Sequence, residues 1–193
     1  KMTKPTTIIK PHLNIVKGEY KQVLLCNSNR SAIDFLKTIK VRKDGNYKKI
    51  PNYLIEKNGK THHLTQDDVT QPFLTGYHND NDKVVVVCLE NLGWLKRRHQ
   101  DGKYVTWLGD IYNNKVYEKK WRGRLFWDTY TEKQLEGVLV LIKNICEEHK
   151  IPFEFIGHNV IVDGVENFNG VVCRSNYNEY WRDVNPSFNF ELL

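Results

Sequence analysis

The sequence has no apolar run near the roughly 20 residues that a membrane-spanning helix requires. It contains 12 glycines and 6 prolines, too few for a collagen-like or low-complexity chain. No internal repeat is visible, and residues 1–5 lack the apolar segment of a secretory signal. We therefore expect neither a membrane protein, nor a disordered tail, nor a coiled coil.

Cysteine is scarce and widely spaced, with no C-x-x-C pair among Cys26, Cys88, Cys146 and Cys173. This spacing argues against a zinc ribbon and against a dense disulfide framework. Cys88 and Cys146 lie within apolar runs, so we expect both to be small core residues.

The composition is that of a folded, soluble chain, with 40% hydrophobic, 27% charged and 12% aromatic residues among 193. The net charge of +6 permits nucleic acid, an anionic membrane or an anionic wall polymer as partner. Basic residues are scattered, with dense clusters at 96–99 and 119–124, and we expect both clusters to be solvated loops. Trp121, within 119–124, would also suit a sugar or a nucleic-acid backbone.

The first half of the chain alternates strand and helix patterns. Residues 21–26 read as a buried strand, followed by a polar turn from which Ser31 would cap a helix over 32–40. Asn58 and Gly59 separate two strand-like runs, 52–57 and 60–64, which predicts a hairpin with a type I′ turn.

The second half contains the best helix. Four successive valines within 83–89 predict a central buried strand, and 94–128 predicts short strands on an elaborated loop. Thr131 and Gln134 form a capping-box pattern that opens a helix over 132–149. Residues 153–156 are then predicted to be a strand. The fold class is therefore α/β, a mixed central sheet flanked by helices.

Three polar groups follow predicted strands or lie near the end of the chain: Cys26, His158 and Asp183. An α/β sheet builds its site at such positions. Each signal alone is weak, because a lone His is more often a structural hydrogen-bonding group and a lone Asp is usually a cap.

Several blocks of sequence occur in the order found in one known family. Residues 130–135, 151–152 and 156–159 closely match the pattern YT-x-x-Q…IP…GH, and residues 52–59 resemble the hairpin HFLI-x-x-DG. These blocks resemble type 2 N-acetylmuramoyl-L-alanine amidases, which share their fold with peptidoglycan recognition proteins. The remaining similar blocks are residues 23–28, 77–91 and 183–188.

The resemblance implies a single amidase-like domain over residues 1–193, with an aromatic-rich insertion at about 94–128 and a second at about 159–182. It also implies a zinc hydrolase that cuts the bond between N-acetylmuramic acid and L-alanine. Peptidoglycan or a muropeptide would be its partner.

The resemblance assigns His158, Asp183 and Cys26 as metal ligands, with Cys173 as the rival third ligand. Three ligands leave one position of Zn²⁺ open for a water molecule, whose pKa the metal lowers to about 7. The family has His where this chain has Cys26. Cys26 is therefore either a thiolate ligand or a buried core thiol, and the second case would leave no catalytic zinc.

The helper groups of the family also differ here. Pro51 aligns with a helper Tyr, and Trp181 aligns with a helper Lys. Arg182 is the substitute catalytic residue, although a guanidinium cannot shuttle protons. His78 aligns with a substrate-cleft His and is the second predicted catalytic residue. We expect His62, His99 and His149 to be surface or hydrogen-bonded histidines.

Two functions from different classes remain open. One is a zinc-dependent, endolysin-like amidase encoded by a phage. The other is a degenerate pseudoenzyme that binds peptidoglycan or serves as a virion structural module, with the tryptophans of residues 94–128 as its recognition surface. Without a signal peptide, either would be in the host cytoplasm before lysis or associated with a virion and its proteins. Nucleic acid and membrane are not expected partners.

Overall fold

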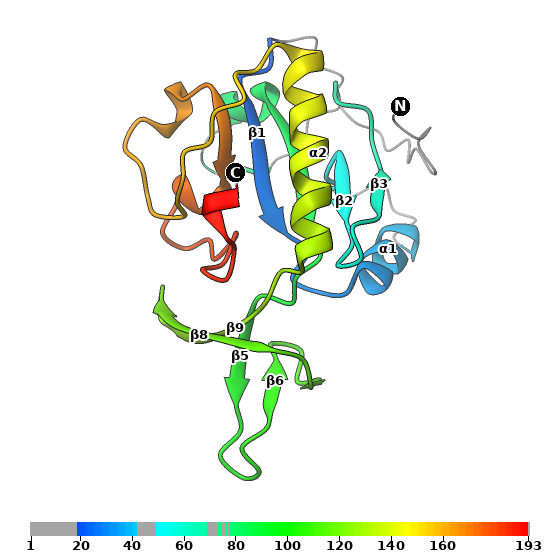
Figure 1. Ribbon diagram of the computed structural model, residues 1–193, viewed down its shortest axis with the longest axis vertical. Helices are drawn as coiled ribbons and strands as arrows, with labels where there is room; N and C mark the ends of the chain where they lie inside the picture. Colours follow the sequence, from blue (N-terminus) through cyan, green and yellow to red (C-terminus); the bar gives the residue numbers. More distant parts are fainter. Residues whose placement is uncertain (1–18, 42–48, 69–72, 75, 77, 193) are drawn as a thin grey trace.

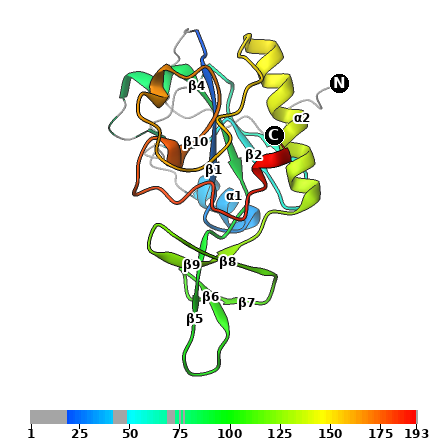
Figure 2. The ribbon, with the colours of Figure 1, turned by 60° about the vertical axis from the view of Figure 1, so that its left-hand side comes forward.

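The computed structural model describes residues 19–41, 49–68, 73, 74, 76 and 78–192. A main body contains a five-stranded sheet with a helix on each face, and a second five-stranded sheet projects from one end of it (Figures 1 and 2). The architecture is therefore mixed α/β, as the sequence predicts. No helix in the described part of the chain is long and apolar enough to cross a membrane.

The main sheet has the strand order β10-β1-β4-β2-β3. Strands β10, β1, β4 and β2 are parallel, and β3 pairs antiparallel with β2. All six residues of β1 and of β4 are buried, as expected for central strands covered on both faces. The bounds are β1 Gln22–Asn27, β2 Tyr53–Ile55, β3 Thr61–His63, β4 Val84–Leu89 and β10 Gly170–Cys173.

Each face of the sheet packs against one helix. Alternate residues of β1 point to opposite faces, so Leu25 packs in the cluster beneath α2 (Glu132–His149) and Cys26 in the cluster beneath α1 (Ala32–Val41). The Thr131 hydroxyl accepts a hydrogen bond from the Gln134 backbone N–H, which confirms the predicted helix start.

The hairpin at residues 52–64 is present, but its turn is not the predicted type I′. Only Gly59 has a positive φ, of 87°, whereas type I′ requires one at Asn58 as well. The Glu56 N–H donates to the Lys60 carbonyl, and the Gly59 N–H donates to the Glu56 carbonyl. A three-residue loop with glycine in the left-handed region therefore replaces the two-residue turn.

The predicted strand at 153–156 is wrong. Only Phe155 forms a bridge, to Val171, while β10 takes the place beside β1. The four residues of β10 are all buried, whereas Phe153 and Glu154 are exposed. Burial of the more apolar segment explains which of the two runs pairs with β1.

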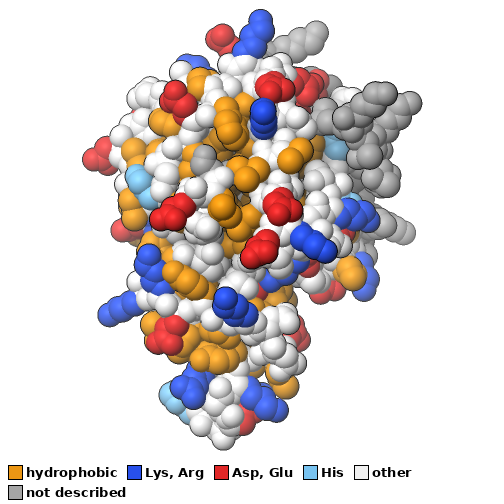
Figure 3. Space-filling model, viewed as in Figure 1, with side chains coloured by type: hydrophobic (Ala, Val, Ile, Leu, Met, Phe, Trp, Pro, Cys, Tyr) orange, Lys and Arg blue, Asp and Glu red, His pale blue; other side chains and the backbone are white. Residues whose placement is uncertain are grey.

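The second sheet lies within residues 94–128 and is antiparallel, in the order β7-β6-β5-β9-β8. Trp127 and Asp128 are fully buried at its junction with the main body. Figure 3 shows basic and hydrophobic side chains interspersed on this projecting sheet. The bounds are β5 Trp94–Arg97, β6 Tyr104–Thr106, β7 Ile111–Tyr112, β8 Val116–Trp121 and β9 Arg124–Asp128.

A short ion pair at the hairpin makes stability depend on pH. His62 Nε2 lies 2.5 Å from Glu56 Oε1. Burial would raise the pKa of Glu56, but the hydrogen bond and charge of His62 bring it below its ordinary value. The stabilisation that this lowered pKa reports is fully present at pH values above the pKa of Glu56 in the unfolded chain. It is lost as the pH falls through the lower pKa of Glu56 in the folded chain.

We therefore expect Glu56→Gln to be destabilising at pH 6, with the destabilisation shrinking as the pH falls through the lowered pKa of Glu56. Urea unfolding of both proteins across this range measures the difference. A difference that stays constant with pH would contradict the ion-pair explanation.

Candidate functional site

A buried ion pair lies at the carboxyl ends of the central strands. Arg174 follows β10 directly, and its Nε and Nη2 atoms contact Asp183 Oδ1 at 3.1 Å and Oδ2 at 2.9 Å. The Asn27 backbone N–H at the end of β1 donates to Asp183 Oδ2 at 3.0 Å. Asp183 is only 2% exposed, so its carboxylate is held entirely by protein donors.

Polar side chains extend this ion pair into a buried network. The Tyr130 hydroxyl donates to Asn27 Oδ1 at 2.7 Å and accepts from the Asn185 backbone N–H at 3.2 Å. Burial raises the pKa of Tyr130 far above its ordinary value, so its hydroxyl stays protonated. The Asn185 side chain donates to Asn91 Oδ1 at 2.9 Å.

Asp128 connects this network to the projecting sheet. Its Oδ1 accepts from the Lys57 ammonium at 2.5 Å and from the Tyr112 hydroxyl at 2.7 Å. Its Oδ2 accepts from the Leu92 backbone N–H at 2.7 Å. The two sheets therefore share one rigid, charge-compensated junction.

Among the described residues, the donor atoms of the predicted metal ligands do not all lie within 4.8 Å of one another. Cys26 packs against Cys88 on the α1 face of the sheet, Cys173 lies on the α2 face, and His158 is exposed on a loop. Among the described residues, the group of three His, Cys, Asp or Glu donors within 4.8 Å of one another is elsewhere, at Asp67, Glu148 and His149. The assignment of Cys26, His158, Asp183 and Cys173 as ligands stays a prediction that this geometry does not support.

Two buried thiols near Asp183 have raised pKa values. Burial, with Cys26 as neighbour, raises the pKa of Cys88 well above its ordinary value, and burial does the same for Cys173. Zinc binds the thiolate rather than the thiol. All four cysteines are buried and free of disulfides.

A guanidinium occupies the region where the resemblance implies zinc. Burial alone would lower the pKa of Arg174, but charge interactions with Asp183, Cys26 and Cys88 raise it above its ordinary value. Arg174 therefore interacts with two of the predicted ligands, Asp183 and Cys26, and it cannot be deprotonated. Because both Asp183 oxygens are occupied and a fixed cation is present, these residues do not fit a zinc ion.

The two predicted catalytic residues are not part of this network. Arg182 Nε donates to the Arg122 backbone carbonyl at 3.0 Å, which ties the carboxyl-terminal segment to the β8–β9 turn. His78 begins the short 3-10 helix His78–Lys83, and its side chain lies outside the described residues. Their catalytic roles remain predictions.

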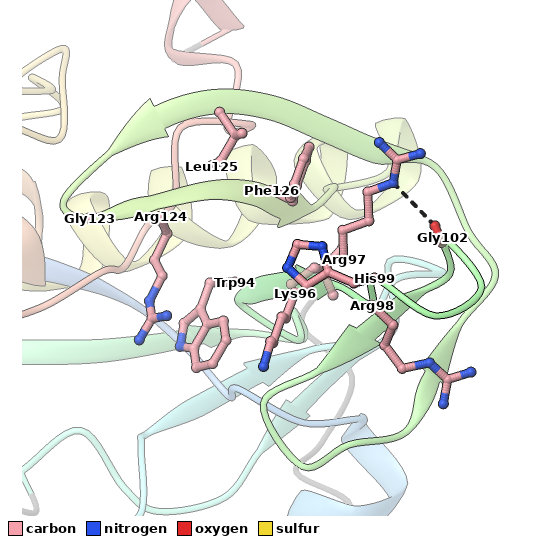
Figure 4. Close-up of a pocket in the computed structure, with 11 residues that line it drawn as sticks. Trp94, Lys96, Arg97, Arg98, His99, Gly102, Gly123, Arg124, Leu125 and Phe126 are labelled. Atoms are coloured by element: carbon pink, nitrogen blue, oxygen red, sulfur yellow. Dashed lines mark hydrogen bonds between the residues drawn. The ribbon is translucent and has the colours of Figure 1, made fainter.

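The projecting sheet carries a pocket of about 440 Å³ between β5, β9 and the β5–β6 turn (Figure 4). Four permanent cations line it, and none of the described lining residues is acidic. Lys96 and Arg97 lie on strand β5, which corrects the prediction that cluster 96–99 is a loop. The cations are Lys96, Arg97, Arg98 and Arg124.

Arg124 and Trp94 form the aromatic side of the pocket. The guanidinium carbon of Arg124 lies 3.7 Å from the centre of the Trp94 ring, a cation–π contact. Arg124 Nε is buried and has no hydrogen-bond partner among the described residues. Arg98 is paired with Asp101, whereas Lys96 and Arg97 are exposed. The pocket is therefore suited to an anionic group next to a flat or apolar one.

No protein-family model matches the chain, and no curated protein sequence matches it. Comparison with solved structures identifies its fold, which is the fold shared by type 2 N-acetylmuramoyl-L-alanine amidases and peptidoglycan recognition proteins. This confirms, as a shared fold, the resemblance seen in the sequence.

Three of the solved structures with this fold come from two bacteria and from human. The amidase AmiD from E. coli, in complex with an anhydro-N-acetylmuramic acid peptide, has a TM-score of 0.53 and 14% identity, covering 91% of this chain and 56% of that one. The endolysin amidase LysCS from Clostridium intestinale has a TM-score of 0.50 and 9% identity, covering 97% and 91%. Human PGRP-IBETAC with a glycosamyl muramyl pentapeptide has a TM-score of 0.51 and 11% identity, covering 94% and 86%. The chain thus spans little more than half of AmiD.

Sequence reasoning missed Arg174 and Asn27, the two groups that hold Asp183. The sequence did carry a signal, because both residues directly follow buried apolar runs, at 171–173 and 23–26. Residues 156–159 are similar to the family's GH pattern, which indicates His158 rather than Arg174 or Asn27 as a site residue. The buried partner of an acid is visible only once the strand order is known.

Proposed function

We propose that this chain binds peptidoglycan fragments through an amidase fold whose metal centre has been replaced by an ion pair. The buried Arg174–Asp183 pair is the observation that carries this proposal. The fold shared with AmiD and with human PGRP-IBETAC, both solved with muramyl peptides, supports the choice of ligand. Shared fold alone does not imply shared activity.

A zinc-dependent amidase is the alternative that the geometry supports less. It would require Asp183 to leave Arg174, a thiol of Cys26 or Cys173 to ionise, and His158 to move from solvent to the strand ends. Breaking a buried ion pair costs several kcal/mol because it leaves an uncompensated charge. We therefore favour binding without hydrolysis.

The pocket of the projecting sheet is the proposed contact for the anionic groups of the ligand. Peptidoglycan stem peptides carry carboxylates, which Lys96 and Arg97 would bind by charge-assisted hydrogen bonds. The Trp94 ring offers an apolar face for a sugar or an alkyl chain. The similarity to an endolysin supports a phage-encoded protein that meets the wall at lysis or on a virion.

Co-sedimentation with purified peptidoglycan sacculi tests this function. We expect the unaltered chain to sediment in the presence of a metal chelator, since no metal is needed. Lys96→Gln with Arg97→Gln should weaken binding about tenfold, the effect of roughly 1.4 kcal/mol of lost contacts.

Lys119→Gln with Lys120→Gln is the matched control. It removes the same charge from exposed positions of β8, in the same sheet but outside the pocket. Equal losses in both double variants would indicate a non-specific charge effect. Failure of the unaltered chain to bind sacculi would contradict the proposed function.

A further inference from the structure

A second group of donors lies at the other end of the main sheet. The distal cluster consists of His63, Asp67, Glu148 and His149, from strand β3, the loop after it and the last turn of α2. Donor atoms of Asp67, Glu148 and His149 all lie within 4.8 Å of one another. His149 Nε2 is 2.6 Å from Asp67 Oδ2.

Two atoms of this cluster are left without hydrogen bonds. His63 Nε2 and Asp67 Oδ1 are buried and have no hydrogen-bond partner among the described residues. They lie 3.6 Å apart, too far for a good hydrogen bond. Two ligands on one tetrahedral zinc ion, each bonded at about 2.1 Å, are separated by about 3.4 Å. The gap between the two atoms therefore has the size that a shared metal ion would fill.

The surroundings hold these donors in place. The side chain of Asp67 is only 10% exposed. The Tyr53 ring stacks on His63 at 4.4 Å, and the Tyr20 ring meets His149 edge-on at 4.6 Å. Burial would raise the pKa of Asp67, but the His63 and His149 rings bring it below its ordinary value, so the carboxylate is ionised.

The distal cluster is separate from the Arg174–Asp183 network. Tyr20 precedes β1, whereas Asn27 ends it, so the two groups lie at opposite ends of the same strand. Helix α2 begins near the projecting sheet and ends, at His149, on the far side of the main body (Figure 1). A metal here would not take part in chemistry at the strand ends.

We propose that the distal cluster binds one divalent transition-metal ion of the zinc class. Imidazole nitrogens combined with carboxylate oxygens favour zinc, cobalt or nickel over calcium or magnesium. Binding replaces the direct contact between Asp67 and His149 and connects strand β3 to the end of α2. The role is structural, because it joins the last strand of the main sheet to helix α2.

Metal titration of the whole, metal-stripped chain tests the proposal. We expect one saturable site for Zn²⁺ by calorimetry and, for Co²⁺, a visible absorption spectrum of nitrogen and oxygen ligation. Glu148→Gln should weaken binding at least tenfold. Its side chain is exposed, so this variant is expected to fold. His149→Gln should abolish the site.

His99→Gln and His158→Ala are the controls, since each removes an exposed histidine elsewhere. Both should bind Zn²⁺ like the unaltered chain. The absence of a saturable site, or binding unchanged in both Glu148→Gln and His149→Gln, would overturn the distal site. Binding lost only in His158→Ala would overturn it too and would also contradict the proposed function. Sacculus binding by His149→Gln should remain intact. This measurement therefore distinguishes a failure of the distal metal site from a failure of the proposed function.

Discussion

Replacing Arg174 with methionine is expected to destabilise the fold by about 3–5 kcal/mol, because it leaves the buried Asp183 carboxylate without its cation. Methionine keeps most of the side-chain volume, so the effect reports the lost charge and hydrogen bonds rather than a cavity. Urea unfolding followed by tryptophan fluorescence measures the change in the free energy of unfolding.

The double variant Arg174→Met with Asp183→Asn measures the interaction free energy between these two side chains. Asparagine removes the charge and can still accept the hydrogen bond from the Asn27 N–H. The double variant should lose clearly less stability than the sum of the two single variants. Additive losses would show that the two side chains do not act together. Arg98→Ala, which breaks the exposed pair with Asp101, should have no measurable effect.

Gly170→Ala is expected to cost about 2–4 kcal/mol, from overpacking and from backbone strain together. Gly170 opens β10 with φ +146°, and a Cβ there would lie 2.3 Å from the Glu154 carbonyl oxygen. Backbone atoms cannot yield as a flexible side chain can.

Gly109→Ala is the matched control for this substitution. Gly109 has φ +93°, but a Cβ would meet nothing within 4 Å. It should therefore show only the cost of the left-handed conformation, about 1 kcal/mol. Similar losses for both variants would mean that β10 is not tightly packed against residue 154. Chemical unfolding under identical conditions compares them.

The elements that local patterns determine could be predicted from the sequence. The helix over 132–149 follows from its cap and apolar stripe, and the buried strands over 21–26 and 83–89 follow from their continuous apolar character. Cys88 and Cys146 are buried, as their apolar neighbours indicate. These predictions depend on neighbours a few residues apart, which the sequence displays directly.

The partner of β1 could not be predicted in the same way. Two candidate runs, 153–156 and 170–173, both lie beyond α2, and either could follow a right-handed crossover to the β1 edge. The choice depends on burial against distant residues and on the close approach that Gly170 permits. The sequence pattern points to His158 as a group near Asp183 and gives no sign of Arg174, so it does not predict the ion pair.

Digestion of sacculi in the presence of added zinc tests the central claim most directly. Purified chain, pre-loaded with Zn²⁺, is incubated with sacculi, and mass spectrometry follows stem peptides with a free L-alanine amino terminus. A known active amidase serves as positive control. The account predicts that the chain stays bound and releases no such peptides above background. Zinc-dependent release that is lost in Asp183→Asn would contradict the account. It would indicate that Asp183 binds a metal ion rather than pairing with Arg174.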